Sequence, residues 1–173
     1  MDATRSGKSL DMEGLEMIGR NPVGTLITSY HNRPYVSYRP FIIPDGNDPQ
    51  TLVSFLEKSN KQWKHLEFED VLALFQPPVS AIWTNKIQKS DEKIKVVHIY
   101  GSCNVIHERT HAQELFLQVL KVHKPDLLQA WTSSNPAGRE EMMDKVIVFE
   151  MSAEEVAVHQ VEVQPENNAS MVN

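Results

Sequence analysis

The clearest pattern of hydrophobic and polar positions lies in residues 94–106. The odd positions, from Val97 onward, are almost wholly apolar or small, whereas the even positions mix polar and apolar side chains such as His98 and Tyr100. A period of two residues is typical of a strand, because successive side chains point to opposite faces of a sheet. The pattern therefore predicts a long strand with one face in a barrel core and the other against a helix or a partner.

Shorter apolar runs between turn-forming residues predict further strands. They cover residues 24–30, 35–43, 51–56, 71–75, 79–84, 146–151 and 156–163. Pro40 lies inside the second of these runs and cannot donate to a sheet ladder, so we expect an edge strand or a bulge there.

Two segments carry apolar residues at helical spacing instead. Residues 11–19 place Met12, Leu15 and Ile18 on one stripe. Residues 110–122 form a second stripe, made of Ala112, Leu115, Phe116, Val119 and Leu120. A short helix with Trp63 and Leu66 is expected after the strand 51–56, a helical turn over 139–145, and irregular chain around Pro125, Trp131 and Pro136.

Many short strands and few helices predict a mainly β fold of the α+β class, and favour a barrel over a doubly wound sheet. A length of 173 residues suits one domain. We expect this domain to occupy residues 11–163, after a mobile leader (1–10) and before a disordered tail (164–173).

Composition and charge exclude several classes of protein. The net charge of −6 argues against a surface that attracts nucleic acid as a whole. The apolar runs are far shorter than the roughly 20 residues of a membrane-spanning helix. Cys103 is the single cysteine, so no internal disulfide and no thiolate metal site can form, and a reducing cytoplasm is the expected compartment. The segment from Lys86 to Lys95 predicts a solvated hairpin loop.

The segment after the strand 51–56 carries the most informative chemistry. Lys58, Ser59, Asn60 and Lys61 lie between this strand and the short helix of Trp63. Backbone N–H groups at a helix start attract anions, a hydroxyl and an amide can add donors, and lysines supply positive charge. The pattern indicates either a phosphate-binding turn or ordinary helix capping with solvated lysines.

The histidines and the cysteine give weaker indications. His107 is expected to precede the helix that carries His111, so this pair predicts capping or surface residues and no metal site. His98 is either a neighbour of a flavin or a haem, or a hydrogen-bonded residue at a dimer seam. Cys103 predicts a core thiol. No catalytic residue can be assigned.

Five segments in the same order resemble the PaiB-like family of FMN-binding proteins, within the pyridoxamine phosphate oxidase-like superfamily. They are NPVGTLIT at 21–28 (HPxGxLVT in the family), NKQW at 60–63 (NPQW), LFQPP at 74–78 (IFxGP), VHIYG at 97–101 (VHAYG) and VIVFE at 146–150 (IVGFE). The resemblance implies a split β-barrel of the FMN-binding type with short flanking helices. It also implies a homodimer with FMN between the subunits.

In that superfamily the turn after the third strand grips the FMN phosphate. This carry-over assigns Lys58, Ser59, Asn60 and Lys61 to the cofactor and Trp63 to bracing the turn. A flavin-dependent oxidoreductase follows from the resemblance, since the redox chemistry belongs to the flavin.

Other positions depart from the family pattern. The family's histidines fall on Tyr38, Phe55 and Val79, and its aromatic segments are replaced at 81–84 and 91–94. These losses favour an alternative, a flavin-free transcriptional regulator or interaction module on the same dimeric scaffold. The absence of a helix-turn-helix pattern argues against direct reading of DNA.

Overall fold

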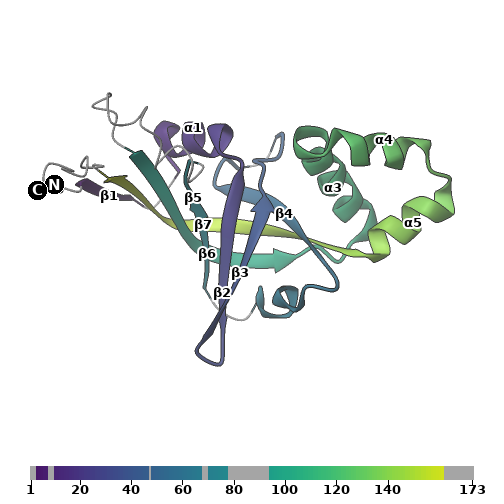
Figure 1. Ribbon diagram of the computed structural model, residues 1–173, viewed down its shortest axis with the longest axis horizontal. Helices are drawn as coiled ribbons and strands as arrows, with labels where there is room; N and C mark the ends of the chain where they lie inside the picture. The colour runs from purple at the N-terminus through teal and green to yellow at the C-terminus, as the bar shows by residue number, and fades with distance from the viewer. Residues whose placement is uncertain (1–2, 8–9, 47, 68–69, 78–93, 162–173) are drawn as a thin grey trace, which may run out of the picture.

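A curled antiparallel sheet crosses the middle of the molecule, with α1 near one end and α3, α4 and α5 at the other (Figure 1). The computed structural model describes residues 3–7, 10–46, 48–67, 70–77 and 94–161. The strands are β1 (Ala3–Gly7), β2 (Val23–Tyr30), β3 (Arg33–Pro40), β4 (Thr51–Glu57), β5 (Val71–Phe75), β6 (Ile94–Val105) and β7 (Val146–Val161). The helices are α1 (Met12–Arg20), the 3-10 helix η1 (Lys61–His65), α3 (Arg109–His123), α4 (Pro125–Ser133) and α5 (Pro136–Asp144).

Strand β7 connects the parts of the sheet. It pairs with β6 along its length, with β4 near its start and with β1 near its end. From β6 the sheet continues through β5 and β2 to β3. The prediction of two separate strands over 146–151 and 156–163 was wrong. The break in the alternation between them is a bulge opposite Tyr100 and Gly101, and β7 continues through this bulge as one strand. Residues 3–7, predicted as part of a mobile leader, instead pair with β7 as β1.

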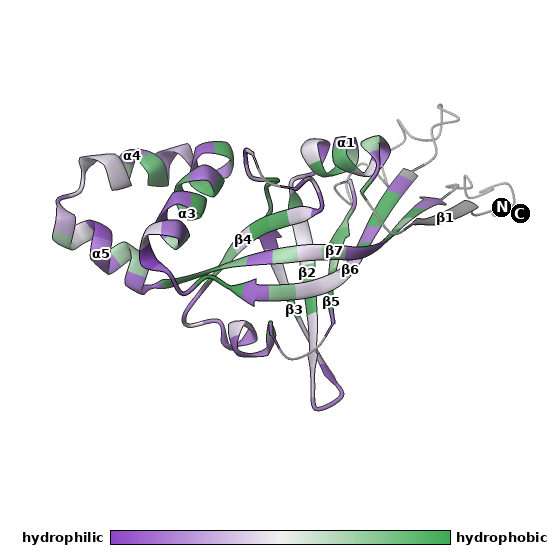
Figure 2. Cartoon of the chain, turned by 180° about the vertical axis from the view of Figure 1, so that it is seen from behind, coloured by the Kyte–Doolittle hydropathy of each residue, from purple (hydrophilic) through white to green (hydrophobic). Residues whose placement is uncertain are grey.

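The alternation predicted for residues 94–106 is confirmed. Val97, Ile99, Cys103 and Val105 are buried in the barrel core. Three phenylalanines fill the middle of this core: Phe41 lies edge-on to Phe75 and to Phe149, with ring centroids 5.4 and 6.3 Å apart. Figure 2 shows this distribution, with hydrophobic segments along the strands and mixed character along the helices.

A second apolar cluster lies between the other face of β4 and β7 and the helices α3, α4 and α5. The helical stripe predicted for residues 110–122 is confirmed, since its apolar members are all buried. Phe116 of this stripe lies against Phe55 and Trp131, with ring centroids 5.0 and 6.2 Å apart. Irregular chain was the wrong prediction for residues 125–136. Pro125 and Pro136 begin helices α4 and α5, where a proline loses no helical hydrogen bond.

The hairpin of β2 and β3 forms one edge of the sheet. His31 and Asn32 have positive φ angles of 50° and 59°, which suit the tight two-residue turn between twisted strands. Pro40 ends β3, so the predicted edge position is confirmed, although the strand stops before residue 43.

Other predictions concerned residues 79–95 and the tail 164–173, most of which the structure does not describe. The strand over 79–84, residues 86–93 and the tail 164–173 lie outside the described residues. Lys95, expected in a solvated loop, lies in β6 and pairs with Glu13 of α1 at 2.5 Å. No helix in the described part of the chain is long and apolar enough to cross a membrane.

Candidate functional site

The turn between β4 and η1 is a tight, basic corner. The backbone N–H of Lys58 donates to Lys145 O at 2.8 Å, and that of Asn60 donates to Glu57 O at 2.9 Å. Lys58, Ser59 and Lys61 are exposed. Their side chains therefore project from a turn whose backbone is held by hydrogen bonds at Lys58 and at Asn60.

Asn60 joins this turn to the edge strand. Its side-chain oxygen accepts from the N–H of Gln62 at 3.0 Å, and its amide nitrogen donates to Ser37 Oγ at 2.8 Å. Arg39 adds a second link, because its guanidinium donates to Glu57 at 2.7 Å. Asn60 was predicted to offer a donor to a ligand, but the oxygen and the nitrogen of its side-chain amide both form hydrogen bonds within the fold.

Trp63 contacts the backbone of the turn. Its indole Nε1 donates to Lys58 O at 3.1 Å, and the ammonium of Lys64 lies 5.7 Å from its ring centroid. The indole is half-buried against the barrel core. This contact holds the backbone at Lys58 in one position.

Gln62 and His65 were not singled out from the sequence, although Gln62 lies within the NKQW motif. Gln62 is buried, and its amide nitrogen donates to Leu26 O at 3.2 Å and to Tyr35 O at 3.1 Å. His65 is buried and stacks on Tyr30 with ring centroids 4.3 Å apart. These contacts fasten η1 onto the β2–β3 hairpin.

Replacing Gln62 by alanine is expected to lower the free energy of unfolding by about 1–3 kcal/mol, because the buried carbonyl of Leu26 and the partly buried carbonyl of Tyr35 lose a donor. Urea denaturation of the two proteins measures the difference. Gln129→Ala, on the exposed side of α4, is the matched control and should change the free energy by no more than about 0.5 kcal/mol. Equal stability of the Gln62 variant and the control would contradict this role.

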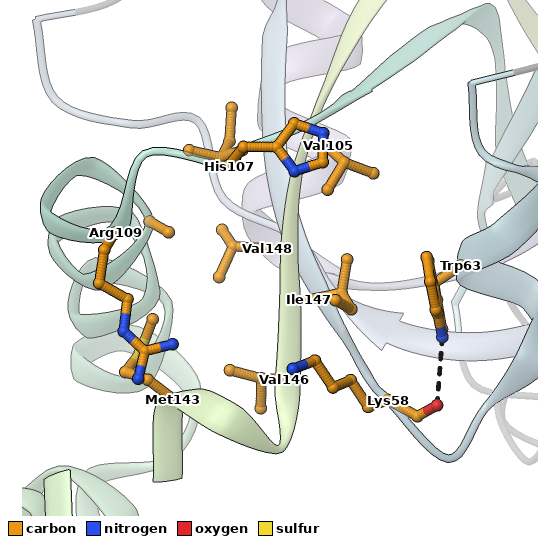
Figure 3. Close-up of a pocket in the computed structure, with 11 residues that line it drawn as sticks. Lys58, Trp63, Val105, His107, Arg109, Met143, Val146, Ile147 and Val148 are labelled. Carbon is orange, nitrogen blue, oxygen red and sulfur yellow. Dashed lines mark hydrogen bonds between the residues drawn. The ribbon is translucent and has the colours of Figure 1, made fainter. Parts of the chain in front are cut away.

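A cavity of about 300 Å³ opens beside the turn (Figure 3). Its wall is mainly apolar and comes from the end of β6, the start of β7 and the helices η1, α3 and α5. The apolar lining consists of Trp63, Val105, Ile106, Ala112, Met143, Val146, Ile147 and Val148. The basic lining consists of Lys58, His107 and Arg109. Such a wall suits a ligand with a flat apolar part and a negative charge.

The positive charges around the cavity are not equivalent. Arg109 pairs with Glu140 at 2.5 Å and with Asp144 at 3.0 Å, and these partners raise its pKa. Within the described ranges, Lys58 of the cavity lining forms no ion pair, and neither does Lys61, which belongs to the turn but does not line the cavity. Lys58 extends along the cavity toward Val146 (Figure 3). The lysines of the turn are therefore the charges available to an anion.

Two other candidate residues lie apart from the turn. Cys103 is buried, and burial, with Glu67 nearby, raises the pKa of its thiol to about 12, which leaves no thiolate for nucleophilic chemistry. His107 precedes α3 and is exposed, as predicted, and it reaches the rim of the cavity. Among the residues that the structure describes, no three His, Cys, Asp or Glu side chains gather as metal ligands.

A comparison with protein families matches residues 8–155 to a family described as a putative FMN-binding domain. The chain belongs to this family. A curated relative is the protease synthase and sporulation protein PAI 2 of Bacillus subtilis, which is 24% identical over 161 residues, or 90% of this chain and 78% of the relative. The resemblance to the PaiB-like family is thereby confirmed.

Solved structures share the fold. The flavocytochrome Anf3 of Azotobacter vinelandii superposes with a TM-score of 0.64 at 15% identity, over 94% of this chain and 70% of its own. A pyridoxamine 5′-phosphate oxidase homologue of Listeria innocua superposes with a TM-score of 0.55 at 12% identity, over 83% and 93%. The predicted split barrel with flanking helices is confirmed. Because the identities are low, these structures establish the fold alone.

Proposed function

We propose that this protein binds FMN through the turn from Glu57 to Lys61. The observation that carries the proposal is the pairing of a basic turn with an apolar cavity beside it. The phosphate would lie on Lys58, Ser59 and Lys61, and the ring would lie against the apolar wall. Family membership supports FMN, or a related flavin, as the ligand.

The donors of the turn fit a phosphate. Among the described residues, the backbone N–H groups of Ser59 and Lys61 have no acceptor, and the Ser59 hydroxyl adds a third donor. The one carboxylate of the turn, Glu57, is held by Arg39. Free N–H groups, a hydroxyl and unpaired ammonium groups are the donors that bind phosphate in proteins.

A second copy of the chain would complete the site. A volume of about 300 Å³ is at the lower end for small-molecule sites, which span about 300–1,000 Å³. The turn contacts β3 through Ser37 and Arg39, and β3 exposes Val36 and Tyr38 from its other face. A partner that covers this exposed face would therefore lie on the strand that holds the turn. This arrangement favours a homodimer with the flavin between the subunits.

FMN supplies the redox chemistry when it is bound, which makes a flavin-dependent oxidoreductase the proposed activity. The residues of the chain bind and orient it. Lys58 and Lys61 would neutralise the phosphate, and Val146 and Val148 would exclude water from the ring. The single, buried cysteine supports the cytoplasm as the compartment.

Replacing Ser59 and Lys61 together by alanine is expected to raise the Kd for FMN at least about tenfold, because each hydrogen bond to a charged group contributes about 1.5–3 kcal/mol. Quenching of flavin fluorescence during titration measures this change. Lys121→Ala, which removes an exposed charge at the end of α3, is the matched control and should leave the Kd unchanged.

Two outcomes of this experiment speak against the proposal. Superimposable titration curves for wild type and the double variant would show that another surface holds the phosphate. Purified wild type that is colourless and takes up no added FMN would instead favour the flavin-free interaction module or regulator on the same scaffold.

A further inference from the structure

A buried hydroxyl lies on the inner face of the β2–β3 hairpin. Thr28 is 2% exposed, and it shares a face of β2 with the buried Leu26 because the two are separated by one strand period. The register places Tyr35 of β3 directly opposite Thr28. Among the described residues, the Thr28 hydroxyl has no hydrogen-bond partner. Since a buried polar group without a partner costs free energy, a folded protein normally supplies one.

The 3-10 helix η1 brings two more polar atoms of the same kind. Gln62 and His65 are three positions apart, so in a helix with three residues per turn their side chains lie on one face. Gln62 is 1% exposed and His65 is 7% exposed. In the part of the chain that the structure describes, neither Gln62 Oε1 nor His65 Nδ1 has a hydrogen-bond partner.

The contacts of Gln62 place its side chain beside Thr28. Its amide nitrogen donates to Leu26 O on β2 and to Tyr35 O on β3. Leu26 lies one strand period before Thr28, and Tyr35 lies opposite it. The amide of Gln62 therefore lies over the hairpin next to the Thr28 side chain, and its oxygen is the group left without a donor.

The contacts of His65 place its ring on the other side of Thr28. The imidazole stacks on Tyr30, with ring centroids 4.3 Å apart, and lies tilted against Tyr35, with ring centroids 4.7 Å apart. Tyr30 lies one strand period after Thr28 on the same strand. The Thr28 side chain is therefore flanked by the amide of Gln62 and by the imidazole of His65.

We propose that one water molecule is buried between η1 and the β2–β3 hairpin, where it bridges Thr28, Gln62 and His65. The donors and acceptors balance. Gln62 Oε1 accepts only, His65 Nδ1 accepts when the ring carries its proton on Nε2, and the Thr28 hydroxyl has a proton to donate. Water donates twice and accepts from the hydroxyl, which gives the three hydrogen bonds typical of a buried water.

Water fits this site better than a cation does. The three side chains carry no negative charge, and a buried cation needs a charged partner. The bridge adds a polar link to the direct contacts that hold η1 against the hairpin. It does not depend on FMN, because none of its three residues belongs to the turn from Glu57 to Lys61.

Thr28→Val tests the bridge through the sign of its effect in urea denaturation, because valine replaces the hydroxyl by a methyl group of nearly the same size. If water bridges the site, the variant loses a hydrogen bond, the urea midpoint falls and the unfolding equilibrium constant rises about fivefold. If the hydroxyl has no partner, valine removes a buried unpaired group and the midpoint rises. Thr25→Val, on the opposite face of the same strand, is the matched control and should not lower the midpoint.

A high-resolution crystal structure of the protein without FMN gives the second measurement. The proposal expects a water within hydrogen-bond distance of Thr28 Oγ1, Gln62 Oε1 and His65 Nδ1, and its loss in Thr28→Val. A raised urea midpoint, a site without this water, or direct hydrogen bonds among the three side chains would overturn it. If Thr28→Val failed to fold, the wild-type crystal structure would decide. Both measurements stand whether or not the turn binds FMN.

Discussion

Replacing Gly101 by alanine is expected to lower the free energy of unfolding by more than about 3 kcal/mol. A Cβ at this position would lie 1.9 Å from the carbonyl oxygen of Ser152 and 3.0 Å from its carbonyl carbon. Both are backbone atoms of β7 at the bulge, so no side-chain rotation can relieve the contact. Because β7 carries the pairings with β1, β4 and β6, a shift there disturbs the whole sheet.

Thermal unfolding at fixed protein concentration measures this loss, which corresponds to at least about 6 °C in Tm for a domain of this size. Gly19→Ala is the matched control, since a Cβ at Gly19 in helix α1 meets no atom within 4 Å. That variant should be neutral or more stable, because alanine favours a helix interior by about 1 kcal/mol over glycine. Similar Tm values for the two variants would contradict the role of the close approach at Gly101.

The barrel core was predictable because its signal is local. The odd positions of β6 and the stripe of α3 repeat with the period of their own element, and burial follows that period. The helices at Pro125 and Pro136 were missed, because a proline reads either as a break in the chain or as the first residue of a helix. The strand over residues 3–7 was missed since its partner, β7, lies at the far end of the chain.

The candidate site was predictable only in part, for the same reason. The turn residues Lys58 and Trp63 lie close together in the sequence, and the basic segment with the NKQW motif points to them. Met143 lies near the turn because β4 pairs with the start of β7, and Arg109 lies there because the end of β6 pairs with the same strand. The periodicity of a single strand does not reveal either pairing. Gln62 was missed although it lies in the NKQW motif, because its carbonyl partners belong to β2 and β3.

Replacing Phe149 by alanine is expected to cost about 3–5 kcal/mol, as truncation of a fully buried phenylalanine does. Phe149 is 0% exposed and lies between the pairings of β7 with β4 and with β6. The neighbouring Val148 belongs to the helical cluster on the opposite face, so loosening β7 weakens both clusters at once.

Alkylation of Cys103 measures this effect without a denaturant. The thiol is buried in the same core as Phe149, and its raised pKa of about 12 keeps it inert until the barrel opens. A loss of about 3 kcal/mol makes the open state more than about a hundredfold more populated, and the alkylation rate should rise by that factor when closing is fast. Met12→Ala, at an exposed position of α1, should leave the rate unchanged. If Phe149→Ala left Cys103 equally protected, the predicted loss of stability on truncation of Phe149 would be contradicted.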